Sequence, residues 1–286
     1  MTKLLLVFLA LISFAAATEP EHTVTGDVEI VPFTSKIFGN TRNLRILLPP
    51  GYRVMQNRHS RYPVMYMQDG QNLYDVATTP FGQEWQVDET IQLLWSEKKI
   101  APMIIVGIDN AGEKRAEEYL PYRDEKFSPQ VTQPRAADYA RFLIEEVMPY
   151  VEQHYRVKTG PENTGLGGSS YGGLVSLYTV MQHPGIFGHL LIESMPLQIE
   201  NGRLIQDAEA TKQWPDKIFL GIGTKETNSP AMAAEHVQWT LRLERALRQQ
   251  GLGPDRLKYV AKQGAQHNEH AWAERFPKAM LFLWPQ

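Results

Sequence analysis

Cysteine is absent from this chain of 286 residues. Its absence excludes disulfide bonds, thiolate metal sites and cysteine nucleophiles. The chain also lacks a strongly basic stretch, and its formal net charge is −3. Nothing in this distribution indicates a nucleic-acid surface or an electrostatic contact with a membrane. The expected partner is therefore a small molecule or a glycan.

The apolar run at residues 4–15 is too short to span a membrane comfortably, and no lipid-accepting cysteine follows it. Lys3 supplies a positive start, and Ala15-Ala16-Ala17 matches an A-x-A cleavage site. We predict that residues 1–17 are a signal peptide. The mature protein should then be exported to the periplasm or secreted, without a stable membrane anchor.

The remaining residues, 18–286, have the composition of a folded globular protein, and one domain is the simplest count. Short apolar runs alternate with segments of helical periodicity. Strands are expected at residues 28–33, 44–48, 64–67, 103–108, 163–167, 190–192, 217–221 and 257–261, and helices at 85–97, 136–155, 174–182, 231–250 and 269–282. The first two strands should be antiparallel. The later alternation predicts an α/β fold with a mostly parallel sheet covered by helices on both faces. Residues 110–134 are expected to form a long irregular loop.

The pattern G-x-S-x-G occurs once between a predicted strand and a predicted helix, with Ser170 at its centre. A serine hydroxyl is a poor nucleophile, so a hydrolase must expose it, place a base beside it and aim hydrogen-bond donors at the developing oxyanion. A sharp strand-to-helix turn with flanking glycines meets these needs. The competing interpretation is a phosphate-binding loop, but neither Gly-Lys-Ser/Thr nor G-x-G-x-x-G is present here.

A base for Ser170 should be a histidine downstream of the acid. His267 follows the last predicted strand, where a loop holds an imidazole over the edge of the sheet. His270 and His236 are the alternatives, both inside predicted helices, His236 as a surface residue. Glu226 is the favoured acid because it follows the strand at residues 217–221. Glu193 after the preceding strand remains a rival, and histidine alone is also possible.

An oxyanion hole requires a second donor besides the N–H of Tyr171, the residue after the nucleophile. The loop after the strand at residues 64–67 is the expected source. Gly70 gives this loop the freedom to turn an N–H inward, and we choose the N–H of Gln71. The alternative is that Asp69-Gly70 is only a tight turn.

Four motifs together resemble the putative-esterase branch of the α/β-hydrolases, which includes enterochelin, feruloyl and acetylxylan esterases, esterase D and mycolyltransferases. They lie at residues 66–72, 115–121, 167–173 and 264–272 and follow the family's order. The resemblance implies Ser170 as nucleophile, His267 as base, an acid near Glu226, and donors at Gln71 and Tyr171. The chain lacks the extra N-terminal domain of the large siderophore esterases, so their substrate cannot simply be transferred.

The resemblance also places Arg115, Glu118 and Tyr119 beside the pocket, where a guanidinium can bind an anionic or polyhydroxy substrate. An Arg115–Glu118 ion pair that braces the loop is equally compatible with the sequence. Trp85, with Tyr74 and Tyr119, is a candidate for lining a pocket for a catechoyl or feruloyl group, although large aromatic residues are more often core.

The sequence therefore predicts an exported serine carboxylic-ester hydrolase that acts through an acyl-enzyme on siderophore, feruloyl or acetyl-glycan esters, and this chemistry requires no metal or organic cofactor. Two alternatives stay open: an acyltransferase with the same triad, and a non-catalytic carbohydrate-binding descendant of the fold.

Overall fold

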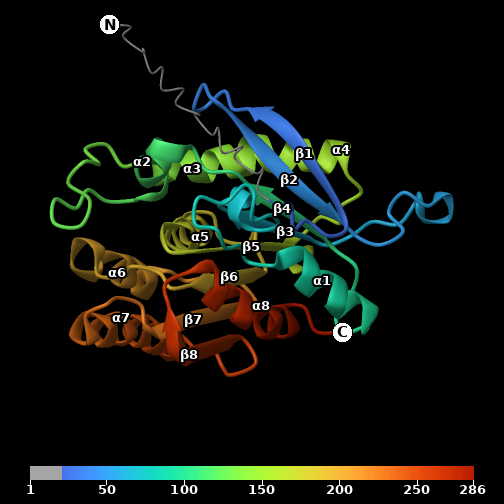
Figure 1. Ribbon diagram of the computed structural model, residues 1–286. Coiled ribbons are helices and arrows are strands. Elements are labelled where there is room, and N and C mark those ends of the chain that lie inside the picture. Colours follow the sequence, from blue (N-terminus) through green and yellow to red (C-terminus); the bar gives the residue numbers. More distant parts are fainter. Residues whose placement is uncertain (1–20) are drawn as a thin grey trace, which may run out of the picture.

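The computed structural model describes residues 21–286 (Figure 1), so the predicted signal peptide lies outside the described residues. Within them, eight strands form one sheet in the order β1-β2-β4-β3-β5-β6-β7-β8. The strands are β1 (Asp27–Thr34), β2 (Thr41–Leu48), β3 (Val64–Gln68), β4 (Ile104–Ile108), β5 (Thr164–Ser169), β6 (His189–Glu193), β7 (Lys217–Lys225) and β8 (Leu257–Gln266). β1 and β2 are antiparallel, as predicted, and β2 is also antiparallel to β4. From β4 onward all pairings are parallel, which confirms the predicted mostly parallel sheet.

The longer helices are α1 (Val87–Ser96), α3 (Ala136–Arg141), α4 (Met148–His154), α5 (Tyr171–Gln182), α6 (Arg203–Ala210), α7 (Pro230–Gln249) and α8 (Glu269–Leu283). The helix predicted over residues 136–155 is α3 and α4 joined by a π-helical turn, η4 (Phe142–Val147). Short 3₁₀ turns complete the chain: η1 (Met55–Asn57), η2 (Gly70–Asn72), η3 (Gly112–Lys114), η5 (Pro161–Asn163) and η6 (Ile199–Gly202).

Helices cover both faces of the sheet (Figure 1). Successive side chains of a strand point to opposite faces, and β3 shows the result. Tyr66 packs in the larger apolar cluster with α3, α5, α6 and α7, whereas Met65 and Met67 pack in the second cluster with α1 and α8. Burial on both faces explains why the neighbouring strands β3 and β4 are apolar runs without alternation.

Two expectations need correction. Residues 110–134 are not wholly irregular, because they contain η3 and the short helix α2 (Arg115–Tyr119). α6 is absent from the predicted elements, because eight residues form too short a helix to be stable alone, and its apolar residues Leu204, Ile205 and Ala208 are buried only by packing against other elements, which include α7.

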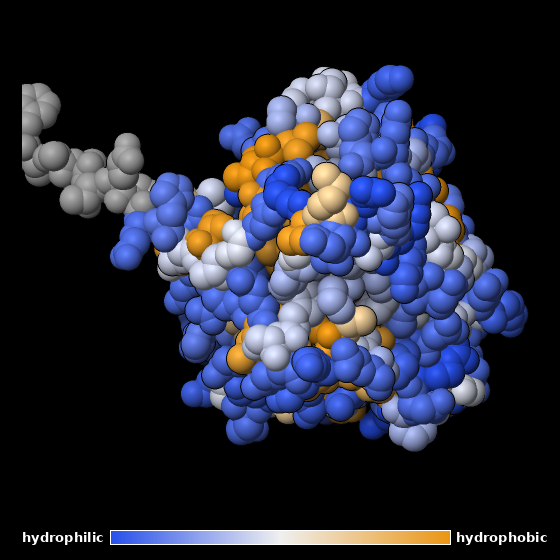
Figure 2. Space-filling view, turned by 90° about the vertical axis from the view of Figure 1, so that its right-hand side faces the viewer, coloured by the Kyte–Doolittle hydropathy of each residue, from blue (hydrophilic) through white to orange (hydrophobic). Residues whose placement is uncertain are grey.

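No helix among the described residues combines the length and hydropathy needed to cross a lipid bilayer. Figure 2 shows the face that lies on the right-hand side of Figure 1: polar residues cover most of it, and hydrophobic residues gather only in small groups.

Candidate active site

Ser170 occupies the sharp turn between β5, which ends at Ser169, and α5, which begins at Tyr171. Its backbone is at φ 53° and ψ −128°, a conformation that is costly for a residue with a Cβ. The turn is possible because glycines surround it. A Cβ on Gly168 or on Gly172 would lie only 2.9 Å from the Cβ of Gln68 on β3. The Ser170 side chain is thereby held at the surface of a pocket.

His267 and Glu226 each follow the last residue of a strand, β8 and β7 respectively. These strands are parallel neighbours, and Lys225 is in register with Gln266, so the two following residues emerge together. The distance from His267 Nδ1 to Glu226 Oε2 is 2.6 Å. Asn268 caps α8 by accepting a hydrogen bond from the Ala271 N–H, which fixes where the chain turns after His267.

The carboxylate of Glu226 is buried and satisfied on both oxygens. Its Oε1 accepts hydrogen bonds from Ser194 Oγ at 2.8 Å and from the Gly223 N–H at 2.6 Å. Burial opposes its ionisation, but the hydrogen bonds from His267, Ser194 and Gly223 outweigh burial and lower the pKa of Glu226 below 4.5. An ionised Glu226 can only accept, so His267 Nδ1 carries the proton and Nε2 is left without one.

Glu193, the rival acid, faces a different partner. Its buried carboxylate forms an ion pair with Arg275 of α8, at 2.7 Å from Arg275 Nη2. The next residue, Ser194, has a positive φ of 50°, and its hydroxyl donates a hydrogen bond to Glu226, the favoured acid. Trp272 Nε1 in turn donates to Ser194 Oγ at 2.9 Å, while its ring lies edge-on to the His267 ring at 5.2 Å. Ser194, directly after β6, therefore holds Glu226 in place, while Glu193 is paired with Arg275 and not with His267.

The other two candidate histidines lie elsewhere. The His270 side chain is 68% exposed, in the first turn of α8, with Glu274 at 3.9 Å. His236 lies in α7 and contacts Gln198 at 3.2 Å. It is half-buried and not the surface residue expected.

The two expected oxyanion donors lie at neighbouring turns. Tyr171 is the first residue of α5, and Gln71 lies in η2, directly after β3. Gln71 is held in place because its side-chain Oε1 accepts from the Asn110 N–H and its carbonyl accepts from Thr78 Oγ1. Within the described part of the chain, neither the Gln71 nor the Tyr171 amide donates a hydrogen bond. Both remain available to an incoming oxygen.

Ser170 and His267 share one pocket of about 610 Å³. Its walls combine apolar and polar groups: Gln71, Asn72, Pro80, Phe81, Gln83, Asn110, Gly112, Arg115, Asn268, Glu269 and Trp272. Glu269 is buried there and accepts a hydrogen bond from Asn72 Nδ2 at 3.1 Å. Burial raises the pKa of Glu269 above 4.5. A volume of this size suits a small-molecule acyl group.

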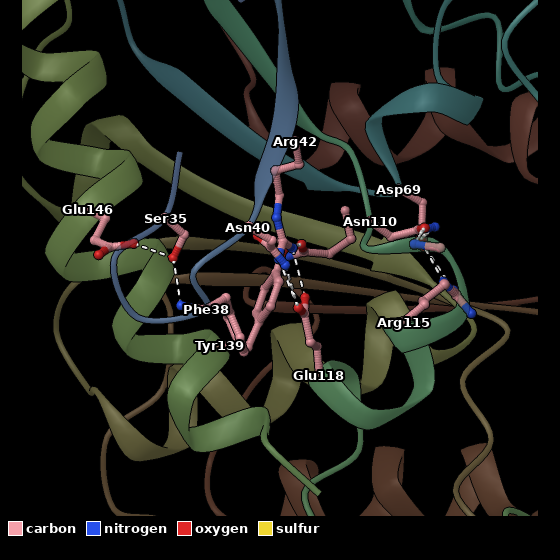
Figure 3. Close-up of polar contacts among 12 residues, drawn as sticks. Ser35, Phe38, Asn40, Arg42, Asp69, Asn110, Arg115, Glu118, Tyr139 and Glu146 are labelled. Atoms are coloured by element: carbon pink, nitrogen blue, oxygen red, sulfur yellow. Dashed lines mark hydrogen bonds and ion pairs between the residues drawn. The ribbon is translucent and has the colours of Figure 1, made fainter. Parts of the chain in front are cut away.

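Of the four residues expected to bind substrate, Arg115 reaches the pocket. Its guanidinium forms a two-point ion pair with Asp69, at 2.6 and 2.8 Å (Figure 3). It lies over the rings of Tyr119 and Tyr171 at 5.2 and 5.5 Å. Asp69 has a left-handed backbone (φ 57°) and leads directly into η2. Arg115 therefore fixes the loop that carries the Gln71 N–H.

The expectation for Glu118 is wrong. Its buried carboxylate is paired with Arg42 of β2 at 2.7 and 2.8 Å, on the side of α2 away from Asp69 (Figure 3). The alternative Arg115–Glu118 ion pair is also absent, because each residue has a different partner. Glu118 therefore links α2 to the sheet through its ion pair with Arg42.

The aromatic expectations are corrected in the same way. Tyr119 is fully buried beneath Arg115, with its ring edge-on to Tyr139 at 4.8 Å. Trp85 and Tyr74 are buried in the second apolar cluster, where Trp85 packs on Trp272 and Phe276. None of the three lines the pocket. Two other aromatic residues, Phe81 and Trp272, do line it. Trp272 ends the predicted motif at residues 264–272, whereas Phe81 carries no sequence signal that distinguishes it from core residues.

The family model described as "Putative esterase" matches residues 35–283. The chain belongs to the putative esterase family. The family, the fold and the expected resemblance agree, and the protein is an ester hydrolase with the α/β-hydrolase fold.

This esterase is similar to several characterised and uncharacterised proteins. Over 246 residues it is 23% identical to the uncharacterized protein YbbA of Bacillus subtilis, which covers 85% of this chain and 92% of YbbA. Over 209 residues it is 27% identical to an endo-1,4-beta-xylanase/feruloyl esterase of Xylanibacter ruminicola, covering 70% of this chain and 25% of that protein.

Solved structures share the fold. The BES protein of Bacillus cereus has a TM-score of 0.72 and 20% identity, covering 95% of this chain and 100% of that one. A ferulic acid esterase of Anaeromyces mucronatus, in complex with ferulic acid, has a TM-score of 0.67 and 21% identity, with 93% of both chains covered. Enterochelin esterase of Shigella flexneri has a TM-score of 0.67 and 19% identity, covering 92% of this chain and 60% of that one.

Proposed function

We propose that this esterase is a serine carboxylic-ester hydrolase with Ser170 as nucleophile, His267 as base and Glu226 as the orienting acid. One observation carries the proposal. A serine at a strained strand-to-helix turn shares a pocket with a histidine whose Nδ1 lies 2.6 Å from a buried carboxylate. Nucleophile, base and orienting acid are the parts that acyl transfer through a serine requires.

In the proposed reaction, Ser170 Oγ attacks the ester carbonyl carbon while His267 Nε2 accepts the hydroxyl proton. The negative charge that develops on the carbonyl oxygen is stabilised by the N–H groups of Gln71 and Tyr171. The C–O bond to the alcohol then breaks, and His267 gives its proton to the leaving alkoxide. Water, deprotonated by His267, attacks the acyl-enzyme and releases the acid and free Ser170.

We propose esters of aromatic acids as the substrate class. Phe81, which is 66% exposed, and Trp272 offer flat apolar surfaces in the pocket, and Asn72 and Asn110 supply polar groups nearby. A planar phenolic acyl group makes use of both kinds of contact. Similarity to a ferulic acid esterase and to enterochelin esterase supports the same class.

The proposal is tested with the protein from residue 18 onward. Hydrolysis of p-nitrophenyl acetate, p-nitrophenyl butyrate and methyl ferulate is measured for the wild type and for Ser170→Ala. We expect kcat/KM to be highest for methyl ferulate, and turnover to fall by about 10⁴-fold or more in the variant. Equal rates in the two proteins would contradict the assignment of Ser170.

Two further outcomes refine the function. Preference for acetyl esters over methyl ferulate would overturn the aromatic substrate class and favour acetyl-glycan esters. If an added alcohol acceptor makes ester exchange exceed hydrolysis, the protein is an acyltransferase that uses the same triad.

A further inference from the structure

Glu269 places a buried carboxyl group in the wall of the pocket that holds Ser170 and His267. The residue is only 3% exposed. It belongs to the motif at residues 264–272, but the proposed reaction gives it no task. Glutamate is rarely buried to this extent unless its charge is paired or its oxygens are hydrogen-bonded.

The protein supplies only neutral donors to this carboxyl group. Asn72 Nδ2 donates to Glu269 Oε1 at 3.1 Å, and the Glu269 N–H donates to its own side chain. Within the described residues, the ion pairs formed by Lys, Arg and His go to other acids. Arg115, which also lines the pocket, is paired with Asp69. A carboxylate has about four lone-pair sites, so Glu269 retains the capacity to accept.

Asn72 shows the same shortage of donors. It is 7% exposed and lines the pocket, and its Oδ1 has no hydrogen-bond partner among the described residues. Two neighbouring acceptors in one wall of the pocket, on Glu269 and Asn72, are therefore short of donors. Buried acceptors without donors are costly, and a donor on a bound molecule removes part of that cost.

The position of Glu269 at the start of α8 does not explain its burial. The N-terminus of a helix carries a partial positive charge and favours an acidic residue, but an exposed acid serves that purpose equally well. Burial raises the pKa of Glu269 and so opposes the charge that the helix favours.

Glu269 lies beside one of the flat apolar surfaces of the pocket. Glu269 and Trp272 are three residues apart in α8, so their side chains are neighbours on one side of the helix. Both line the pocket. An aromatic ring that packs against Trp272 consequently has its substituents close to the Glu269 carboxyl group.

We propose that Glu269 accepts a hydrogen bond from a hydroxyl group on the aromatic acyl part of the substrate, and that it selects phenolic acyl groups over those without a hydroxyl. The inference rests on the proposed function, because it assumes hydrolysis of aromatic esters through Ser170. A hydroxyl supplies the missing donor, whereas a hydrogen atom in its place leaves a buried acceptor unpaired. Sites built to bond a hydroxyl discriminate strongly against such analogues.

The test compares two esters with the protein from residue 18 onward. Methyl ferulate and methyl 3-methoxycinnamate differ only in the 4-hydroxyl group and release the same alcohol. We expect the wild type to prefer methyl ferulate by about 10- to 100-fold in kcat/KM, which corresponds to one hydrogen bond to a charged acceptor.

Variants assign this preference to one side chain. Glu269→Leu should reduce it to about onefold, because kcat/KM falls for methyl ferulate and stays within about threefold for methyl 3-methoxycinnamate. If Glu269→Leu does not fold, Glu269→Gln provides the test: it keeps the volume but offers only a neutral, weaker acceptor, so the preference should fall to about two- to fivefold. Glu274→Gln is the matched control. It removes one negative charge from an exposed residue of α8 that is paired with Lys262, and it should keep the full preference.

The possible outcomes separate this inference from the proposed function. Equal losses for both esters in Glu269→Leu would show that Glu269 only positions η2 through Asn72, and would overturn the inference. Hydrolysis that depends on Ser170 but shows no preference for methyl ferulate in the wild type would overturn it as well, and would leave the triad standing. Hydrolysis of both esters that Ser170→Ala does not reduce would contradict the proposed function itself.

Discussion

Two glutamates at the ends of neighbouring strands have different tasks in this esterase. Glu226, one residue beyond β7, bonds His267 Nδ1, while Glu193, the last residue of β6, is paired with Arg275. The two carboxylates point in different directions. The Glu193 carboxylate points toward Arg275 of α8 and packs against Gly221, where a Cβ would overlap it.

We expect Glu226→Gln to lower kcat by roughly 10²- to 10⁴-fold with little change in KM, because a neutral amide neither fixes the His267 tautomer nor stabilises the imidazolium. Steady-state kinetics with methyl ferulate measure this loss. Glu193→Gln is the comparison, and it should keep a kcat within about tenfold of the wild type while lowering stability. Equal losses of kcat in the two variants would contradict the assignment of the acid.

The pH dependence of stability provides a second test at Glu226. Its pKa is lower in the folded protein than the ordinary value of 4.5, so its contribution is complete above pH 4.5. The contribution disappears as the pH falls through the folded pKa. Between about pH 5 and pH 3, Tm of the wild type should therefore fall more steeply than that of Glu226→Gln. Other acids with lowered pKa values, such as Asp75 and Asp124, are common to both proteins and cancel in the comparison. Parallel curves would show that the hydrogen bonds to Glu226 do not stabilise its charge.

At the scale of elements, α2 connects the sheet with η2, the turn that carries the proposed oxyanion donor Gln71. Its first residue, Arg115, holds Asp69 before η2, and Glu118, one turn later, holds Arg42 of β2 (Figure 3). The short helix α2 therefore links β2 to the turn that carries the Gln71 N–H, through one ion pair at each end of the helix. Neither ion pair is part of the proposed chemistry, yet together they place one of its donors.

We expect Arg115→Gln to lower kcat by about tenfold to 100-fold for neutral and anionic esters alike, because η2 loses its anchor and the oxyanion donor moves. KM should change little. Lys114→Gln removes an exposed positive charge from the adjacent position and serves as the control. An increase in KM confined to anionic esters would instead identify Arg115 as a direct substrate ligand.

At the scale of the whole molecule, we propose that the esterase is exported. Expression of the full-length chain in a bacterial host should yield a protein that begins at Thr18, recovered from the periplasm or the medium. Intact-mass measurement of the purified protein identifies the cleavage site. A variant with Ala15→Glu and Ala17→Glu should remain uncleaved, because the cleavage site requires small residues. Recovery of uncleaved wild-type protein from the cytoplasm would refute export.

The sequence by itself determined the class of fold, because buried parallel strands produce apolar runs and amphipathic helices produce a periodicity that is read locally. It also indicated Ser170 and His267, since glycine spacing and position after a strand are local features as well. Only the tertiary structure decided which acid meets His267, that Glu118 braces the sheet, and that Trp85 and Tyr119 are core. These outcomes depend on side-chain direction between segments far apart in the chain, and no local pattern encodes that direction.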